Sequence, residues 1–268
     1  MCSSDLSSTF TWPITSALLT WTDWRGVTFI DALAMICISG PMIAYALRKP
    51  YPLLTALTGE DKSDEDDLSL PLTGVAQVPK ENHLKAMILF AMIFAAQGFV
   101  LNAMSIHVLS LFENLGMSAG AAMLAGTLIG PSQVAARLIE LLFGRSLSVM
   151  NLGLITMGLF PLALAVPLLL PPSLMTAFIF GVVYGASAGL STIVRGVMPY
   201  ELFGAEGYGR RLGLLSAPAL LAKAFAPAAV AIIIDAHGAE LAVLSCITIA
   251  SMALIATAAL DRTVRGAR

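Results

Sequence analysis

The sequence predicts an all-α integral membrane protein, and three observations support this prediction. Of the 268 residues, 57% are hydrophobic and 12% are charged, which is about half the charged share of a typical soluble domain. The apolar residues gather in stretches of about 20, which is long enough for a helix to cross a bilayer. Lys and Arg alternate between the connections that join these stretches. The net charge of −2 excludes an electrostatic partner such as nucleic acid.

Seven stretches are predicted to cross the membrane. The predicted spans are Gly26–Leu47, Leu84–Ile106, Ala119–Leu141, Val149–Leu170, Ser173–Val194, Leu212–Ile234 and Glu240–Leu260. The preceding segment, Ser7–Leu19, is too short to span, and the Trp21 and Trp24 that follow suit a membrane interface. It is interpreted as the end of another helix. The first six residues, MCSSDL, read like a translated sequencing adapter. We interpret 1–6 as an artefact and the chain as truncated at its N-terminus.

The Lys and Arg residues orient the spans. The connections after the first, third and fifth spans and the C-terminal tail contain Lys or Arg, whereas the connections after the second, fourth and sixth spans contain none. Arg25 is the exception. Because basic loops stay in the cytoplasm, the C-terminus and the long loop 48–83 are predicted to be cytoplasmic, with the protein in the inner membrane. The acidic run Gly59–Asp67 indicates a solvated linker, which separates residues 7–47 from a six-helix bundle at 84–268.

A repeat is present within the last six spans. The third span contains GTLIGPSQVAAR (Gly126–Arg137), and the sixth contains GLLSAPALLAK (Gly213–Lys223). In each, Gly is followed by Pro five residues later and then by Ala and a basic residue. The two stretches are three spans apart, and an odd separation inverts the second unit in the membrane. Inverted three-helix units are typical of transporters.

Two stretches carry a resemblance to a known family. GPSQVAARLIELLFGR at 130–145 and TWTDWRG at 20–26 resemble the eighth helix with its loop, and the connection between helices five and six, of the major facilitator superfamily. The resemblance implies a secondary transporter fold, covered here from the end of helix five to helix twelve. It also implies that helices seven, eight, ten and eleven line a central cavity. The loop 144–148 departs from the family motif, since no Asp follows Gly144.

Polar side chains within the spans supply the candidate site. Gln133, Arg137 and Glu140 follow i, i+4, i+7 spacing and therefore share one helix face, on which Arg137 is predicted to pair with Glu140. This pair is either structural or part of a substrate site. Lys223 lies midway along its span between Pro218 and Pro227, and an anion-binding or proton-coupling role competes with a structural pair. The candidate cavity residues are Gln97, Asn102, Gln133, Arg137, Glu140, Tyr184 and Lys223.

Two further polar residues are interpreted as lying at membrane edges. His107 is predicted to be a solvated interface residue, and Arg195 an orienting charge at the cytoplasmic edge of its span. No catalytic residue, metal ligand or cofactor site is predicted, because no nucleophile with a base and no His or Cys cluster with ligand spacing occurs in the sequence.

The sequence favours secondary active transport of a small organic solute by alternating access. Basic residues inside the spans indicate an anionic substrate group, with coupling to a proton or another solute. A membrane-embedded enzyme is the first alternative, but only Arg137 with Glu140 approaches a catalytic cluster. A channel or scaffold subunit is the second, and the deep Lys223 argues against it.

Overall fold

The structure is a computed structural model that describes residues 18, 21–48, 78–144, 147–204 and 207–265. The chain divides into two units, Met1–Leu72 and Thr73–Arg268. In the first unit, helix α2 (Trp24–Arg48) covers the first predicted span, Gly26–Leu47. Its side chains are described only in part, so its crossing of a membrane stays a prediction. The interpreted artefact at 1–6 and the acidic run Gly59–Asp67 lie outside the described residues.

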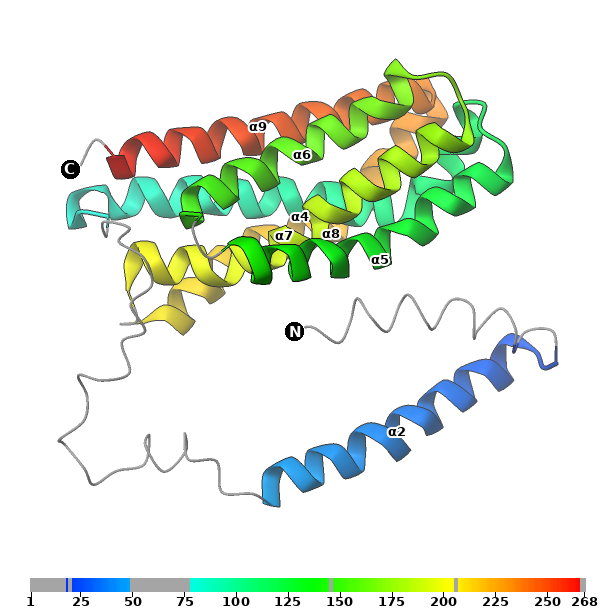
Figure 1. Cartoon of the computed structure of the whole chain (residues 1–268), viewed down its shortest axis with the longest axis horizontal. Coiled ribbons are helices and arrows are strands. Elements are labelled where there is room, and N and C mark those ends of the chain that lie inside the picture. The colour runs from blue at the N-terminus through cyan, green and yellow to red at the C-terminus, as the bar shows by residue number, and fades with distance from the viewer. Residues whose placement is uncertain (1–17, 19–20, 49–77, 145–146, 205–206, 266–268) are drawn as a thin grey trace. The chain divides into compact units, whose positions relative to one another are not determined.

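The second unit consists of six long helices preceded by one short 3-10 turn (Figure 1). Each of the six is long and apolar enough to cross a membrane, which confirms the last six predicted spans as helices. The 3-10 turn is η1 (Lys80–Asn82). The six long helices are, in chain order, α4 (His83–Asn114), α5 (Ala119–Phe143), α6 (Val149–Leu169), α7 (Leu174–Phe203), α8 (Tyr208–His237) and α9 (Ala239–Arg265).

Two helices extend well beyond their predicted spans. α4 has 32 residues and continues to Asn114, past the predicted end at Ile106, while α7 has 30 residues and continues to Phe203, past Val194. At 1.5 Å per residue, 32 residues are about 48 Å long, which exceeds the hydrocarbon core of about 30 Å. Hydropathy detects only the part of a helix that lies within lipid, so it places these two ends too early.

Serine side chains define three helix starts. The hydroxyls of Ser118, Ser148 and Ser173 precede α5, α6 and α7 and accept hydrogen bonds from the backbone N–H groups three residues later. Such caps satisfy amides that have no partner within the helix. The connections between helices are short, so consecutive helices run antiparallel in the unit (Figure 1).

Most of the extensive helix contacts join helices that are not consecutive in the chain. The most extensive contacts join α5 to α7, α4 to α8, α6 to α7, α4 to α9 and α6 to α9. Exchanging α4, α5 and α6 for α7, α8 and α9 leaves this set of neighbours unchanged. In this set the order of neighbours is α5, α7, α6, α9, α4 and α8.

Glycines allow α5 to approach α7 very closely. Gly181, Gly185 and Gly189 recur every four residues and so lie on one face of α7. A Cβ added at Gly185 would lie 2.6 Å from the carbonyl oxygen of Ile129, and one added at Gly189 would lie 2.5 Å from that of Gln133. Small residues at four-residue spacing bring helix backbones together in membranes, where apolar burial gives little driving force.

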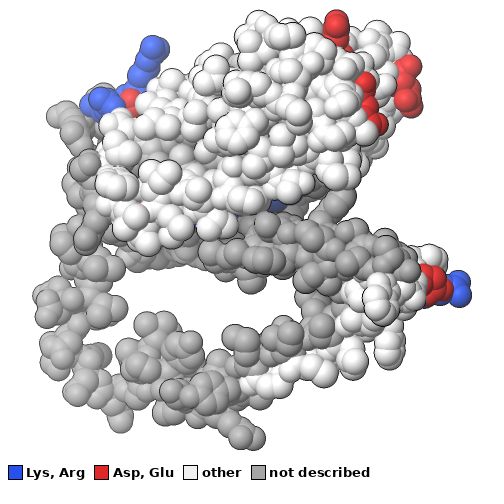
Figure 2. Space-filling view, turned by 45° about the vertical axis from the view of Figure 1, so that its right-hand side comes forward, with Lys and Arg blue, Asp and Glu red and all other residues white. Residues whose placement is uncertain are grey.

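Charged side chains gather at the two ends of the six-helix unit. Glu113, Asp235 and Glu240 are exposed at the end where α4 and α8 finish and α9 begins. At the opposite end lie Lys85, Arg210, Arg211, Arg262 and Arg265. On the face shown in Figure 2, the surface between these two groups is nearly free of charged atoms. This distribution agrees with a membrane-spanning unit, and the side on which the basic end lies stays a prediction.

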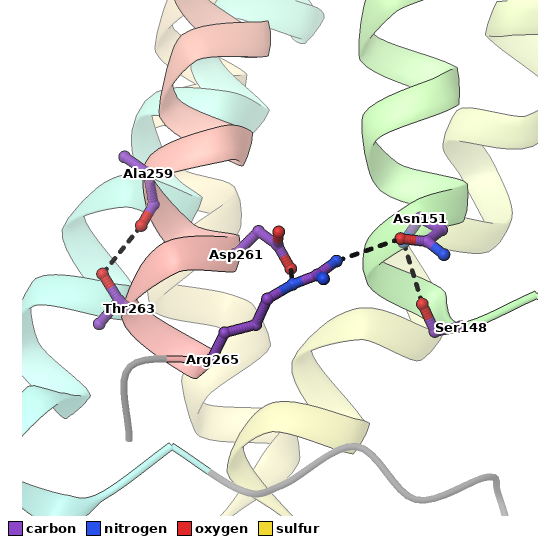
Figure 3. A network of polar contacts seen from close by, with 6 residues as sticks. All are labelled: Ser148, Asn151, Ala259, Asp261, Thr263 and Arg265. Carbon is purple, nitrogen blue, oxygen red and sulfur yellow. Dashed lines mark hydrogen bonds and ion pairs between the residues drawn. The ribbon is translucent and has the colours of Figure 1, made fainter. Parts of the chain in front are cut away.

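A polar network joins α6 to α9 at the basic end (Figure 3). Arg265 Nε donates to Asp261 Oδ1 at 2.8 Å, and its Nη2 donates to Asn151 Oδ1 at 3.4 Å. The backbone N–H of Asn151 donates in turn to the capping Ser148 hydroxyl at 3.3 Å. The start of α6 is thereby tied to the end of α9. Such an exposed ion pair contributes little stability, about 0–1 kcal/mol.

Candidate functional site

Gln97 and Arg195 meet between α4 and α7. Gln97 is 2% exposed, and its Oε1 accepts a hydrogen bond from Arg195 Nη2 at 3.1 Å. The guanidinium also lies 5.5 Å from the ring centroid of Phe94, within cation–π range. Two buried donors are left over, since neither Gln97 Nε2 nor Arg195 Nε has a hydrogen-bond partner. Buried donors of this kind are uncommon and indicate a ligand, a water or a functional role.

The interpretation of Arg195 as a residue at the cytoplasmic edge of its span stays a prediction. Arg195 lies about two turns before the end of α7 at Phe203, and it contacts residues of α4 rather than the end of the bundle. Sequence reasoning missed it because the predicted span ended at Val194, one residue too early to include it. A search that allowed helices longer than the hydrocarbon core would have found it.

The side chain of Lys223 lies against Gly98, the residue that follows Gln97 on α4. A Cβ added at Gly98 would meet the Lys223 side chain at Cγ (3.2 Å) and Cε (3.4 Å), so the aliphatic stem covers this glycine. Lys223 is half-buried. Among the described residues, no carboxylate pairs with Lys223 or Arg195. Arg195 of α7 and Lys223 of α8 therefore contact neighbouring residues of α4, Gln97 and Gly98.

Asn102 holds the backbone of α8 beside Lys223. Pro227 has no N–H and cannot donate to the carbonyl four residues earlier, which is that of Lys223. Asn102 Nδ2 donates to this carbonyl at 2.6 Å. His107, predicted to be solvated at the interface, is instead part-buried and bonds the Pro227 carbonyl through Nε2 at 3.0 Å. Asn102 and His107 thus attach α4 to the proline-containing part of α8.

Arg137 takes the corresponding place between α5 and α7. Its Nε donates to the carbonyl of Gly189 at 3.2 Å, and the backbone of Gln133 lies against the same glycine. The side chain of Glu140 lies over Gly144, where an added Cβ would meet its Cγ at 2.9 Å. The predicted ion pair between Arg137 and Glu140 stays a prediction.

The two basic residues occupy related positions. Gly98 and Gly185 are 87 residues apart, as are Asn102 and Gly189. Gly98 contacts α8 as Gly185 contacts α5, and Arg137 and Lys223 are 86 residues apart. The backbone carbonyl of Lys223 accepts a hydrogen bond from Asn102 of α4, whereas the side chain of Arg137 donates one to the carbonyl of Gly189 in α7. The contacts of Arg137 and Lys223 therefore lead to different helices, α7 and α4.

Tyr184 belongs to the packed core. It is 2% exposed, stacks on Phe180 with ring centroids 5.2 Å apart and meets Phe160 edge-on at 5.6 Å. Its hydroxyl donates to the carbonyl of Val100 at 3.4 Å. These contacts leave Tyr184 without a direct role among the polar residues around Lys223.

The arrangement around Lys223 is suited to binding rather than to chemistry. It combines two cations with an amide, and all of their spare groups are hydrogen-bond donors. No group of three His, Cys, Asp or Glu residues that could hold a metal ion occurs in the part of the chain that the structure describes. Donors and positive charge with no acceptor complement an oxyanion.

No protein-family model matches the chain, and comparison with curated proteins finds no match. The function is therefore argued from the residues and their arrangement.

Proposed function

We propose that this chain contains the C-terminal six-helix bundle of a secondary transporter of the major facilitator type, which moves a small organic solute by alternating access. The observation that carries the proposal is the distribution of polar residues within the apolar helices. Gln97, Asn102, Arg137, Arg195 and Lys223 lie on α4, α5, α7 and α8. By contrast, α6 and α9 have no charged residue in 149–169 and 241–260.

This distribution matches the resemblance noted in the sequence. In that family the helices equivalent to α4, α5, α7 and α8 line the central cavity, and those equivalent to α6 and α9 face lipid. Ionised groups inside a membrane are costly and generally face a bundle interior or water. The proposal explains why five polar residues are confined to four of the six helices.

The helix contacts also support a repeat of three plus three helices. The set of neighbours is unchanged when the first three helices are exchanged with the last three, and Gly98 and Gly185, 87 residues apart, contact α8 and α5 in the same way. Transporters built from inverted repeats bind substrate near the repeat interface and alternate by rocking one bundle against another. In this proposal α2 is the last helix of the other bundle, and the loop 48–83 joins the two.

The alternative classes receive less support. An embedded enzyme requires a nucleophile or a proton-transfer pair, and Gln97, Arg195 and Lys223 offer only donors. A channel or scaffold gives no reason for two adjacent cations, which would repel permeant cations and weaken packing.

Cysteine accessibility tests the proposal. In a variant lacking the native cysteines, single cysteines are placed at Asn102 and Lys223, and at the matched control positions Ile155 on α6 and Ile255 on α9. The control side chains are 45% and 68% exposed, more than the half-buried test positions. In native membranes we expect a charged thiol reagent to label the test positions faster, because lipid covers the controls and water reaches the cavity. Faster labelling at Ile155 and Ile255 would contradict the proposal.

A further inference from the structure

Gln97, Arg195 and Lys223 form a donor cluster that no interaction within the described residues completes. The cluster draws one residue from each of α4, α7 and α8. Gln97 Nε2 and Arg195 Nε are buried without hydrogen-bond partners, and the ammonium group of Lys223 has no ion pair among the described residues. Gln97 is 2% exposed, and a buried amide that retains an unused donor is destabilising.

The charge of the cluster is also unbalanced. Arg195 contacts Gln97 and Phe94 of α4, Lys223 contacts the adjoining Gly98, and both cations lie in helices that are apolar enough to cross a membrane. Two cations in such a place are unfavourable unless an anion accompanies them. The stem of Lys223 packs on Gly98, which keeps its ammonium group within the bundle.

We propose that the donor cluster of Gln97, Arg195 and Lys223 binds the oxyanion group, carboxylate or phosphate, of a water-soluble solute. A planar guanidinium and an ammonium group both form charge-assisted hydrogen bonds with such oxygens, and the amide of Gln97 supplies a neutral donor. Bound anion satisfies the unused donors and balances the charge of the two cations. The inference rests on the proposed function, because the solute reaches the cluster only if water does. It makes Lys223 and Arg195, rather than Arg137, the residues that recognise the anionic group of the substrate.

Ligand-dependent stability is the test. The full chain is placed in nanodiscs of a zwitterionic lipid, and its unfolding temperature is measured against inorganic phosphate and against succinate, with chloride at matched ionic strength as the reference. A ligand that binds only the folded state raises this temperature in a saturable manner. We expect saturable stabilisation by at least one of the two oxyanions and none by chloride.

Substitution of Lys223 distinguishes a binding role from a structural one. In Lys223→Met we expect the affinity for the oxyanion to fall about tenfold or more, as for the loss of one charge-assisted hydrogen bond. Without ligand this variant should be at least as stable as the unsubstituted chain, because a cation without a counter-ion has been removed. Arg262→Met, at the exposed end of α9, is the matched control and should keep the original affinity.

Several results would overturn the inference. These are the absence of saturable stabilisation by either oxyanion, unchanged affinity in Lys223→Met, or a ligand-free Lys223→Met that is markedly less stable than the unsubstituted chain. Stabilisation that requires phosphatidylglycerol in the nanodisc would also overturn it, since the anion would then be a lipid headgroup. If the cysteines at the test positions are labelled faster than the controls but neither oxyanion stabilises the chain, this inference is refuted and the proposed transport function is left in place.

Discussion

At the scale of single residues, proline determines where polar contacts form between α4 and α8. A proline within a helix leaves the carbonyl four residues earlier without its usual donor. Pro227 does so for the carbonyl of Lys223, and Asn102 supplies the replacement donor at 2.6 Å. The same hydrogen bond fixes the backbone that carries the Lys223 side chain. One polar residue on α4 therefore both stabilises α8 and positions the basic residue of the donor cluster.

The coupling between Asn102 and Pro227 can be measured. Asn102→Leu removes the donor and leaves the Lys223 carbonyl unpaired, so we expect the free energy of unfolding to fall by about 1–3 kcal/mol. Adding Pro227→Ala restores a backbone N–H at position 227 and should recover much of this loss. Unfolding in mixed detergent micelles, followed by circular dichroism, gives both values. Strictly additive effects of the two substitutions would show that they do not share this hydrogen bond.

At the scale of helices, close packing of α5 on α7 depends on Gly185 and Gly189. We expect Gly189→Ala to lower the free energy of unfolding by about 1–3 kcal/mol, the range for overpacking, because the added Cβ would lie 2.5 Å from the carbonyl oxygen of Gln133. Gly196 is the control on the same helix, since no atom lies within 4 Å of an added Cβ there. Gly196→Ala should stabilise the helix by about 0.5–1 kcal/mol. Equal effects of the two substitutions would argue against close α5–α7 packing.

The helices were predictable from the sequence because hydropathy is a local property. Length and apolar content identify each of α4 to α9, and the capping serines fix the first residues of α5, α6 and α7. The ends of α4 and α7 were not predictable in the same way, since a helix that leaves the hydrocarbon loses its apolar signal but not its backbone hydrogen bonds. This error left Arg195 one residue beyond the predicted span and out of the candidate site.

The candidate site was predictable only in part. Gln97, Asn102 and Lys223 stand out as polar residues in apolar spans, and the structure brings them together along α4 and α8. Their association with Arg195 depends on a contact between residues 98 positions apart in the chain, which local patterns do not contain. Tyr184 resembles the others in the sequence, but its neighbours Phe160 and Phe180 place it in the core.

At the scale of the whole six-helix unit, charge distribution determines orientation in the membrane. The described Lys and Arg residues outside the helix interiors lie at the end where α4, α6 and α8 begin. The opposite end presents Glu113, Asp235 and Glu240. Lys and Arg close to the ends of spans are retained on the cytoplasmic side, whereas acidic residues contribute little to orientation. The unit is therefore expected to hold its basic end and its C-terminus in the cytoplasm.

Two positions at opposite ends of one helix test this orientation. Gly209 and Ala236 are both exposed and lie near the start and the end of α8, so they differ in depth while sharing the same helix. With single cysteines at these positions in a variant lacking the native cysteines, an impermeant thiol reagent should label 236 on intact cells and label 209 only after the membrane is permeabilised. Because basic residues flank Gly209 at Arg210 and Arg211, their replacement by Gln should weaken the preference and yield a mixed population. Labelling of 209 but not of 236 on intact cells would reverse the orientation, and equal labelling of both would show that α8 does not cross the membrane.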